Sequence, residues 1–275
     1  MLASLGSHKA YFDLFGAENG PVVCLVHSLA SDSGMWAEQI PTLLEGGYRV
    51  LRIDIRGHGG SEAPAGVYSM KELAGDVAAL LDKLAIEKAH FVGLSIGGMI
   101  GQGFALDHPR KVASLVVCDA VPASPPNAKD LWAPRLKAVG EAKSLEPVAG
   151  GTIERWLSAD FKKKNPIRWQ QIFDAIVGTK PKGFIGCATA ITDFNFVDRL
   201  PSIKAPSLVI CGANDPGAPP AENKRIASLI PNGRYEEVAD ALHFPNVERP
   251  AAFNRILRGF LDAQNRRINI VGAPA

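Results

Sequence analysis

The chain has 275 residues, a formal net charge of +2, 47% hydrophobic residues and 21% charged residues. This length and composition are typical of one α/β unit with an insertion, and a chain of this size buries enough surface to fold without disulfides. The nearly balanced charge gives no indication of nucleic acid or of an anionic membrane as a partner.

The cysteines of the chain show no CxxC spacing, and most of them lie inside apolar runs. We interpret them as buried thiols rather than as zinc or redox ligands. No secretory signal is visible at the N-terminus, and no run approaches the roughly 18 apolar residues of a membrane span. We therefore expect a cytoplasmic protein. The cysteines are Cys24, Cys118, Cys187 and Cys211.

Short apolar runs bounded by turn residues predict the strands. Several runs are apolar at nearly every position rather than at alternate ones. This pattern indicates strands that are buried on both faces, as in a parallel sheet covered by helices. The predicted strands cover residues 21–27, 49–54, 90–94, 114–119, 207–212 and 234–238.

Helical patterns separate these strands. The clearest covers residues 69–84, where Ser69 and Glu72 have capping-box spacing and the following apolar residues fall on one face. The alternation of strand and helix predicts a doubly wound, mostly parallel α/β sheet. The other predicted helices cover residues 33–45, 96–107, 222–229 and 251–263.

The alternation breaks after the strand that ends at Asp119. Residues 122–201 open with a loop and then look mostly helical, so we predict a helical cap inserted into the sheet domain. Residues 1–121 and 202–264 would form the α/β core. Residues 265–275 are polar and then contain Gly and Pro, which predicts a poorly ordered C-terminal tail.

The strongest motif is G-L-S-I-G at residues 93–97, followed by Gly98. It comes directly after an apolar strand and directly before a helix, which is the setting of a nucleophile elbow. The serine of such an elbow stands on a sharp strand-to-helix turn, and the glycines leave room for the turn and for close helix packing. We therefore predict that Ser95 is a nucleophile.

A serine hydroxyl needs a neighbouring base, which in turn needs an orienting carboxylate. His243 follows the last predicted strand and precedes the final helix, so we predict it as the base. Nucleophile-elbow enzymes use the chain order serine, acid, histidine. Asp215, just after the strand at residues 207–212, fits this order. Asp119 is the alternative acid, at the end of an earlier strand that some hydrolases of this kind use.

Two backbone N–H groups are expected to form an oxyanion hole. One belongs to Ile96, the residue after the nucleophile, and the other to Leu29, in the loop after the first predicted strand. His27 in that loop is interpreted as structural. The chain has no G-x-G-x-x-G after a strand, no P-loop motif, no HExxH and no Cys/His cluster, so we predict no metal and no cofactor.

Together these motifs resemble the 3-oxoadipate enol-lactonase and carboxylesterase group of α/β hydrolases. The resemblance implies the α/β-hydrolase fold, with its cap after the sixth strand. In the cap it rests on Trp132, Arg135 and the E-R-W triplet at residues 154–156, and implies that Trp132 lines the pocket and Arg135 lies near a substrate carboxylate. Packing of the cap helix is the alternative role for both. The other matching segments are H-S-L-A at residues 27–30, D-I-R-G-H-G at 54–59, G-L-S-I-G-G-M at 93–99, G-A-N-D at 212–215 and H-F-P-N-V-E-R-P at 243–250.

The sequence departs from that group after the acid, where P-G-A-P at residues 216–219 replaces the common D-x-x-T-P pattern. We expect a serine hydrolase that cleaves a small-molecule ester or lactone through an acyl-enzyme. The alternatives are a promiscuous carboxylesterase or cofactor-free perhydrolase, and, in a different class, a receptor of the same fold that binds without turnover.

Overall fold

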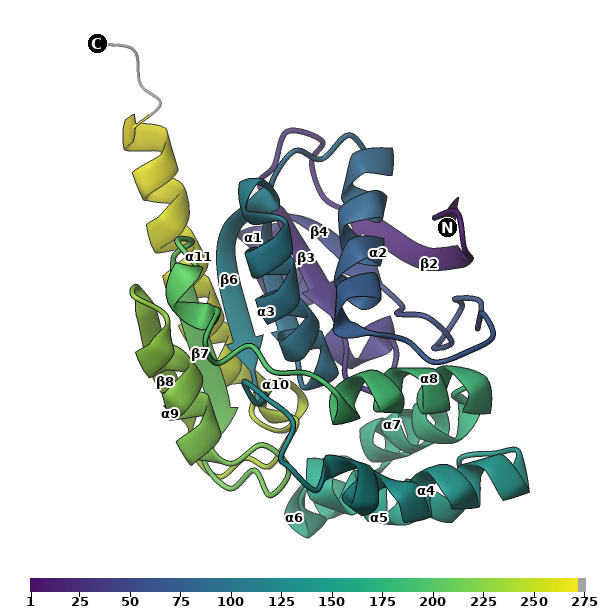
Figure 1. Ribbon diagram of the computed structural model, residues 1–275. Helices are drawn as coiled ribbons and strands as arrows, with labels where there is room; N and C mark the ends of the chain where they lie inside the picture. Colours follow the sequence, from purple (N-terminus) through teal and green to yellow (C-terminus); the bar gives the residue numbers. More distant parts are fainter. Residues whose placement is uncertain (272–275) are drawn as a thin grey trace.

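The computed structural model describes the fold of residues 1–271 and the side chains of residues 1–266. At its centre lies an eight-stranded sheet in the order β1-β2-β4-β3-β5-β6-β7-β8 (Figure 1). Strands β1 and β2 are antiparallel to their neighbours, and the other strands run parallel. The strands are Leu2–Ser4 (β1), Lys9–Phe15 (β2), Val22–Val26 (β3), Arg49–Ile53 (β4), Ala89–Leu94 (β5), Val112–Cys118 (β6), Ser207–Gly212 (β7) and Gly233–Val238 (β8).

All six predicted strands occur, as β3 to β8. Every residue of β3, β5 and β7 is buried, as their continuous apolar patterns predicted. The prediction missed β1 and β2. Strand β2 lies near one edge of the sheet, and its charged residues Lys9 and Asp13 interrupt the apolar pattern that marks the central strands.

Helices cover both faces of the sheet. Figure 1 shows α2 and α3 on one face, while α1 and α11 lie behind the sheet. The capping box predicted at Ser69 and Glu72 begins α2, as expected. These elements are α1 (Ile40–Glu45), α2 (Met70–Lys83), α3 (Ile96–Asp107), α9 (Pro220–Leu229), α10 (Pro245–Glu248) and α11 (Pro250–Val271), with short 3-10 helices at Ser33–Trp36, Pro109–Lys111 and Leu200–Ser202.

The prediction of a single helix over residues 33–45 is wrong. The segment divides into the 3-10 helix Ser33–Trp36 and the separate helix α1. Pro41 lies in the first turn of α1, where it lacks the N–H that a helix continuing from the preceding turn would need.

The cap is helical, as predicted, and joins β6 to β7. Figure 1 shows its helices beyond the carboxyl ends of the parallel strands, on the side where parallel α/β sheets bind ligands. An isolated bridge between Ala123 and Asn195 holds the two ends of the insertion together. The cap helices are α4 (Ala128–Ala142), α5 (Glu146–Trp156), α6 (Ala159–Lys164), α7 (Pro166–Gly178) and α8 (Pro181–Thr192).

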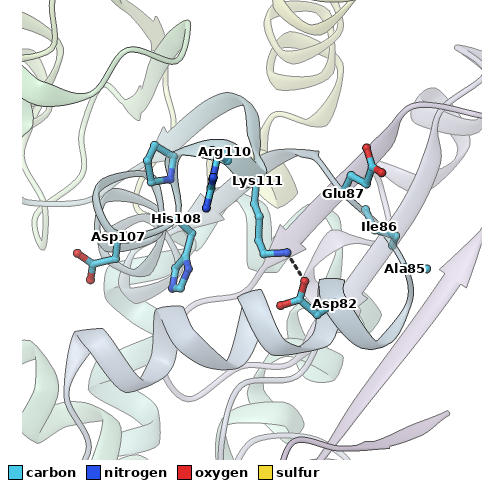
Figure 2. A pocket seen from close by; sticks show the side chains of 9 residues that line it. Asp82, Ala85, Ile86, Glu87, Asp107, His108, Arg110 and Lys111 are labelled. Atoms are coloured by element: carbon cyan, nitrogen blue, oxygen red, sulfur yellow. Dashed lines mark hydrogen bonds and ion pairs between the residues drawn. The ribbon is translucent and has the colours of Figure 1, made fainter.

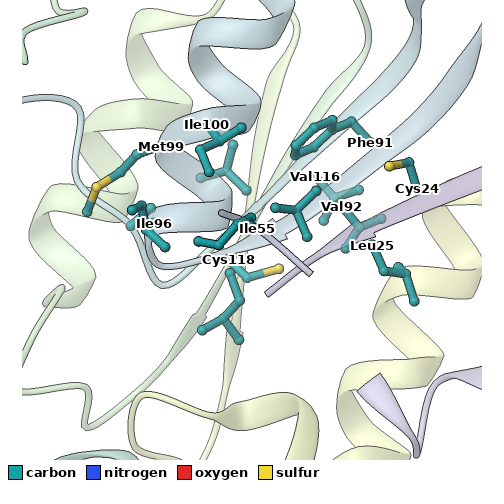
Figure 3. Packing of buried hydrophobic residues seen from close by; sticks show 14 of the residues in the cluster. Cys24, Leu25, Ile55, Phe91, Val92, Ile96, Met99, Ile100, Val116 and Cys118 are labelled. Atoms are coloured by element: carbon teal, nitrogen blue, oxygen red, sulfur yellow. The ribbon is translucent and has the colours of Figure 1, made fainter. Parts of the chain in front are cut away.

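Helix α3 is embedded in the core over most of its length. Residues 96–105 of this helix are all buried, and the rings of Phe91 and Phe104 lie 5.2 Å apart. Figure 3 shows Ile96 and Ile100 of this helix in the same buried cluster as Val92 of β5. Because core packing resists displacement, the turn between β5 and α3 is held on a rigid support.

Part of the predicted C-terminal tail, residues 265–271, belongs to a helix. Helix α11 continues through Val271, and residues 272–275 of the predicted tail lie outside the described residues. None of the described helices is long and apolar enough to cross a membrane.

Candidate active site

Ser95 stands on a strained turn between β5 and α3. Its φ of 58° and ψ of −118° are values that residues with side chains rarely adopt. A Cβ on Gly93 would collide with the carbonyl of Gly97, and a Cβ on Gly97 would collide with the carbonyl of Val26. Both glycines of the motif are therefore required for the sharp turn and for the close approach of α3 to the end of β3.

The turn also connects Ser95 to the neighbouring strand. The Ser95 N–H donates to the Cys118 carbonyl at 2.8 Å. Ser95 is partly exposed although Leu94 and Ile96 on either side are buried. Its hydroxyl is thus held on a rigid backbone and remains accessible to a small molecule, as a nucleophile requires.

His243 and Asp215 form a hydrogen-bonded pair. His243 Nδ1 donates to Asp215 Oδ2 at 2.7 Å, and the Asp215 side chain is fully buried. The Gly217 N–H donates to the other carboxylate oxygen at 2.7 Å. With Nδ1 occupied, Nε2 of His243 remains as the proton acceptor, which is the arrangement of a base oriented by a carboxylate.

The P-G-A-P segment after Asp215 still holds the carboxylate in place, although it departs from the common pattern. Gly217 supplies the N–H to the carboxylate, and the carbonyl of Ala218 accepts a hydrogen bond from Asn223 Nδ2 at 2.7 Å. Pro219 then caps α9. The departure from the D-x-x-T-P pattern therefore leaves the carboxylate hydrogen-bonded and buried.

Asp119, the alternative acid, is also close. It follows β6, between the strands that carry Ser95 and Asp215. Its Oδ1 accepts the Gly212 N–H at 2.8 Å. One oxygen of each aspartate and one ring nitrogen of His243 all lie within 4.8 Å of one another. His243, however, donates its hydrogen bond to Asp215 and not to Asp119.

The loop that carries Leu29 is supported by two buried histidines. His27 Nε2 accepts the Ile55 N–H at 2.9 Å, and His58 Nε2 accepts the Ala30 N–H at 3.1 Å. Ala30 has a φ of 57°, so this loop is strained as well. Burial lowers the pKa of His58 to about 3 and keeps the ring neutral, which it must be to accept this bond. His58 thus also supports the predicted oxyanion loop.

The two predicted oxyanion donors lie on neighbouring segments, because α3 begins against the end of β3 and the start of this loop. Within the described part of the chain, neither the Leu29 N–H nor the Ile96 N–H donates to a protein acceptor. Unsatisfied N–H groups beside a nucleophile are the feature that an oxyanion hole requires.

Comparison with known proteins agrees with this geometry. A family model described as the alpha/beta hydrolase fold matches residues 21–142 and 151–250. The chain belongs to the α/β-hydrolase family. It is 33% identical to 3-oxoadipate enol-lactonase 1 of Acinetobacter baylyi, over 90% of each chain.

Two solved structures are closely similar to this one. The enol-lactonase from Burkholderia xenovorans is 35% identical with a TM-score of 0.90, and the match covers 95% of this chain and 100% of that one. A thermophilic esterase from Thermogutta terrifontis, with malate bound, is 29% identical with a TM-score of 0.88, over 95% of this chain and 96% of that one.

The cap of this α/β hydrolase contacts the histidine loop directly. Trp156, at the end of α5, stacks on Phe244 with ring centroids 4.2 Å apart, and its carbonyl accepts the Phe244 N–H at 3.1 Å. Glu248 accepts N–H groups from Leu242 at 2.8 Å and from Ser158 of the cap at 3.0 Å. The cap therefore helps to position the segment that carries His243, a role that sequence reasoning did not assign to Trp156.

The cap also brings two arginines together. The guanidinium of Arg135 lies over the Trp132 ring at 5.4 Å, and Trp132 contacts Phe184. Burial lowers the pKa of Arg135, and burial together with the charge of Arg135 lowers the pKa of Arg155. Neither arginine forms an ion pair among residues 1–266. Arg155 belongs to the E-R-W triplet on which the resemblance rests, but its proximity to Arg135 was not predicted, because only the packing of α5 against α4 makes the two neighbours.

Metal binding is not assigned to this site. Among the described residues, Asp119, Asp215 and His243 are near enough to share an ion. His243 Nδ1 and Asp215 Oδ2 are hydrogen-bonded to each other rather than free to bind an ion, and Asp119 Oδ1 accepts a backbone N–H.

A separate surface pocket lies at the amino ends of β5 and β6, away from the candidate site. Figure 2 shows Asp82 and Lys111 forming an ion pair at its wall, with His108 nearby. His108 thus lines a surface pocket, and none of the predicted catalytic residues does so.

Proposed function

We propose that this protein hydrolyses a small lactone or ester that carries a carboxylate, through an acyl-enzyme formed on Ser95. The observation that carries the proposal is the strained elbow at Ser95 together with the buried bond between His243 and Asp215. The similarity of the chain to enol-lactonases and esterases supports the same reaction class.

In the first half of the reaction, His243 Nε2 removes the proton from the Ser95 hydroxyl, whose oxygen attacks the carbonyl carbon. Asp215 orients the ring and stabilises the imidazolium that forms. The N–H groups of Leu29 and Ile96 donate to the oxyanion, and each such donor contributes about 10²–10³ in rate. The tetrahedral intermediate collapses as His243 protonates the leaving oxygen.

In the second half, His243 activates water, which attacks the acyl carbon and releases Ser95. The leaving oxygen of a lactone stays attached to the acyl group, so the product is one ring-opened acid. Residues of the chain suffice for each of these steps. The buried cysteines support a cytoplasmic, reducing setting as part of the same proposal.

The two arginines of the cap, Arg135 and Arg155, support the proposal that the substrate is anionic. Both guanidinium groups are half-buried and form no ion pair with a described carboxylate. Their positive charges repel each other, and an anionic ligand would relieve this repulsion. A carboxylate held by Arg135 would place the reacting carbonyl relative to Ser95, because remote binding of this kind orients a substrate.

Replacing Arg135 with alanine is expected to raise KM for a carboxylate-bearing lactone about ten- to a hundredfold, since a charged hydrogen bond contributes roughly 1.5–3 kcal/mol. KM for a neutral ester of similar size should change little. Steady-state kinetics on the two substrates measures the difference, and Arg155→Ala should act in the same direction.

The matched control is Lys137→Ala, which removes an exposed charge from the same helix. An equal change for both substrates would assign Arg135 to packing of the cap. If no lactone or ester in a test panel is turned over by the wild-type protein, the proposed reaction class is wrong and a binding role takes its place.

A further inference from the structure

Asp119 is a buried carboxyl group with an unusual environment. It follows β6 with a φ of 47°, in the left-handed region, and is fully buried. Its backbone N–H donates to the Ile210 carbonyl at 3.0 Å, and its Oδ1 accepts the Gly212 N–H at 2.8 Å. Its Oδ2 accepts no hydrogen bond from any described donor. A buried carboxylate oxygen without a donor is strongly disfavoured.

Among the described residues, no arginine or lysine forms an ion pair with Asp119. The neighbouring Asp215 accepts the hydrogen bond from His243 Nδ1, and one of its oxygens lies within 4.8 Å of an oxygen of Asp119. Two carboxylates this close in a buried site cannot both be ionised at low cost, because like charges repel strongly there. The other titratable groups that face Asp119 are neutral thiols and a phenol, namely Cys118 on β6, Cys211 on β7 and Tyr235 on β8.

We propose that Asp119 is an un-ionised carboxylic acid in the resting protein, and that its Oδ2–H donates a hydrogen bond to Asp215. The two aspartates then hold one proton and one negative charge between them. The proton on Asp119 satisfies its otherwise unpartnered oxygen, and Asp215 gains a further donor beside His243 and Gly217. Asp119 is thus a positioning residue for the carboxylate that orients His243.

The ionisation tendencies of the two groups support this arrangement. Burial, and then the charge of Asp215, raise the pKa of Asp119 well above its ordinary value. Burial also opposes ionisation of Asp215, but His243 and the N–H groups of Gly217 and Ala218 outweigh it and lower the pKa of Asp215. The shared proton therefore resides on Asp119.

The first test compares the wild-type protein with Asp119→Asn by urea unfolding between about pH 5 and 8. An unfolded aspartate loses its proton near pH 4, whereas the folded protein would keep it. The folded wild type then binds one more proton than the unfolded chain, so its stability falls as pH rises until the folded pKa is reached. Asparagine donates the same hydrogen bond without this dependence.

The expected result is that the unfolding constant of the wild type, divided by that of Asp119→Asn, increases up to about tenfold per pH unit. Asp198→Asn is the matched control, because Asp198 is exposed and forms no ion pair in the described part of the chain. A ratio that stays constant over this range would overturn the proposal.

Infrared spectroscopy is a second test of the proposal, and it needs only the wild-type protein rather than a stable variant at Asp119. An un-ionised carboxylic acid has a carbonyl band distinct from that of a carboxylate, and the band shifts in D2O. At neutral pH we expect this band in the wild type and in Ser95→Ala. Its absence would mean that Asp119 is ionised. Both measurements are independent of turnover, so they distinguish a failure of this proposal from a failure of the proposed hydrolysis, on which the positioning role rests.

The positioning role is tested by kinetics. Asp119→Ala removes the donor to Asp215 and should lower kcat about ten- to a hundredfold with KM little changed, the size expected for a lost charged hydrogen bond. Asp119→Asn restores a donor and should recover kcat to within about fivefold of the wild type. If the alanine variant keeps the wild-type kcat, Asp119 does not position Asp215.

Discussion

Ser95→Ala is expected to lower kcat for ester or lactone hydrolysis by about 10⁴-fold or more while leaving the fold intact. The hydroxyl is the atom that attacks the carbonyl, and water positioned by the remaining groups replaces it poorly. The elbow itself depends on Gly93 and Gly97 and on the bond from the Ser95 N–H to Cys118, all of which alanine preserves. Hydrolysis of a p-nitrophenyl ester measures the loss.

Ser228→Ala is the matched control, because Ser228 is exposed on α9 and its hydroxyl bonds only within that helix. Circular dichroism and thermal unfolding would show that both variants fold. If the purified Ser95 variant keeps more than a few per cent of the wild-type rate, Ser95 is not the nucleophile and the reaction must be assigned to other residues.

Asp215→Asn should lower kcat by about 10⁴-fold. An asparagine amide in place of the carboxylate favours the wrong tautomer of His243 and leaves the imidazolium without a compensating charge. The wild-type bond of 2.7 Å to Nδ1 and full burial make this carboxylate hard to replace by water. Single-turnover measurements of acylation should show the loss directly.

Asp119→Asn provides the comparison for this prediction, since the two aspartates lie side by side. Asp119 bonds to the Gly212 N–H rather than to His243, so its conservative replacement should cost little. The opposite ranking, with a large loss for Asp119→Asn and a small one for Asp215→Asn, would identify Asp119 as the orienting acid.

Much of the fold was predictable because its signals are local. Central parallel strands are apolar along their whole length, and Ser69 and Glu72 begin α2 with a capping box that involves neighbouring residues only. The edge of the sheet was not predictable in this way. Strand β2 carries charged residues, and only pairing with β4, far along the chain, makes it a strand.

The features of the candidate site likewise fall into two groups, those that local sequence predicts and those that depend on tertiary packing. The role proposed for Ser95 follows from glycine spacing, because a sharp strand-to-helix turn has steric requirements within a few residues. The proximity of Arg155 to Arg135 depends on how α5 packs against α4. The contact of Trp156 with Phe244 likewise joins the cap to a loop of the core that lies far along the chain.

By itself the sequence determined the fold class, the elbow at Ser95 and the chain order of the proposed acid and base, because short-range sterics and burial patterns specify all three. It left two aspartates as candidates for the acid. Only the tertiary structure decided which of them bonds to His243 and left Asp119 buried beside it, with one oxygen that has no hydrogen-bond partner among the described residues. The physical reason is that β6 and β7 pair over a long sequence separation, and the environment of a buried carboxyl depends on which groups that pairing brings near it.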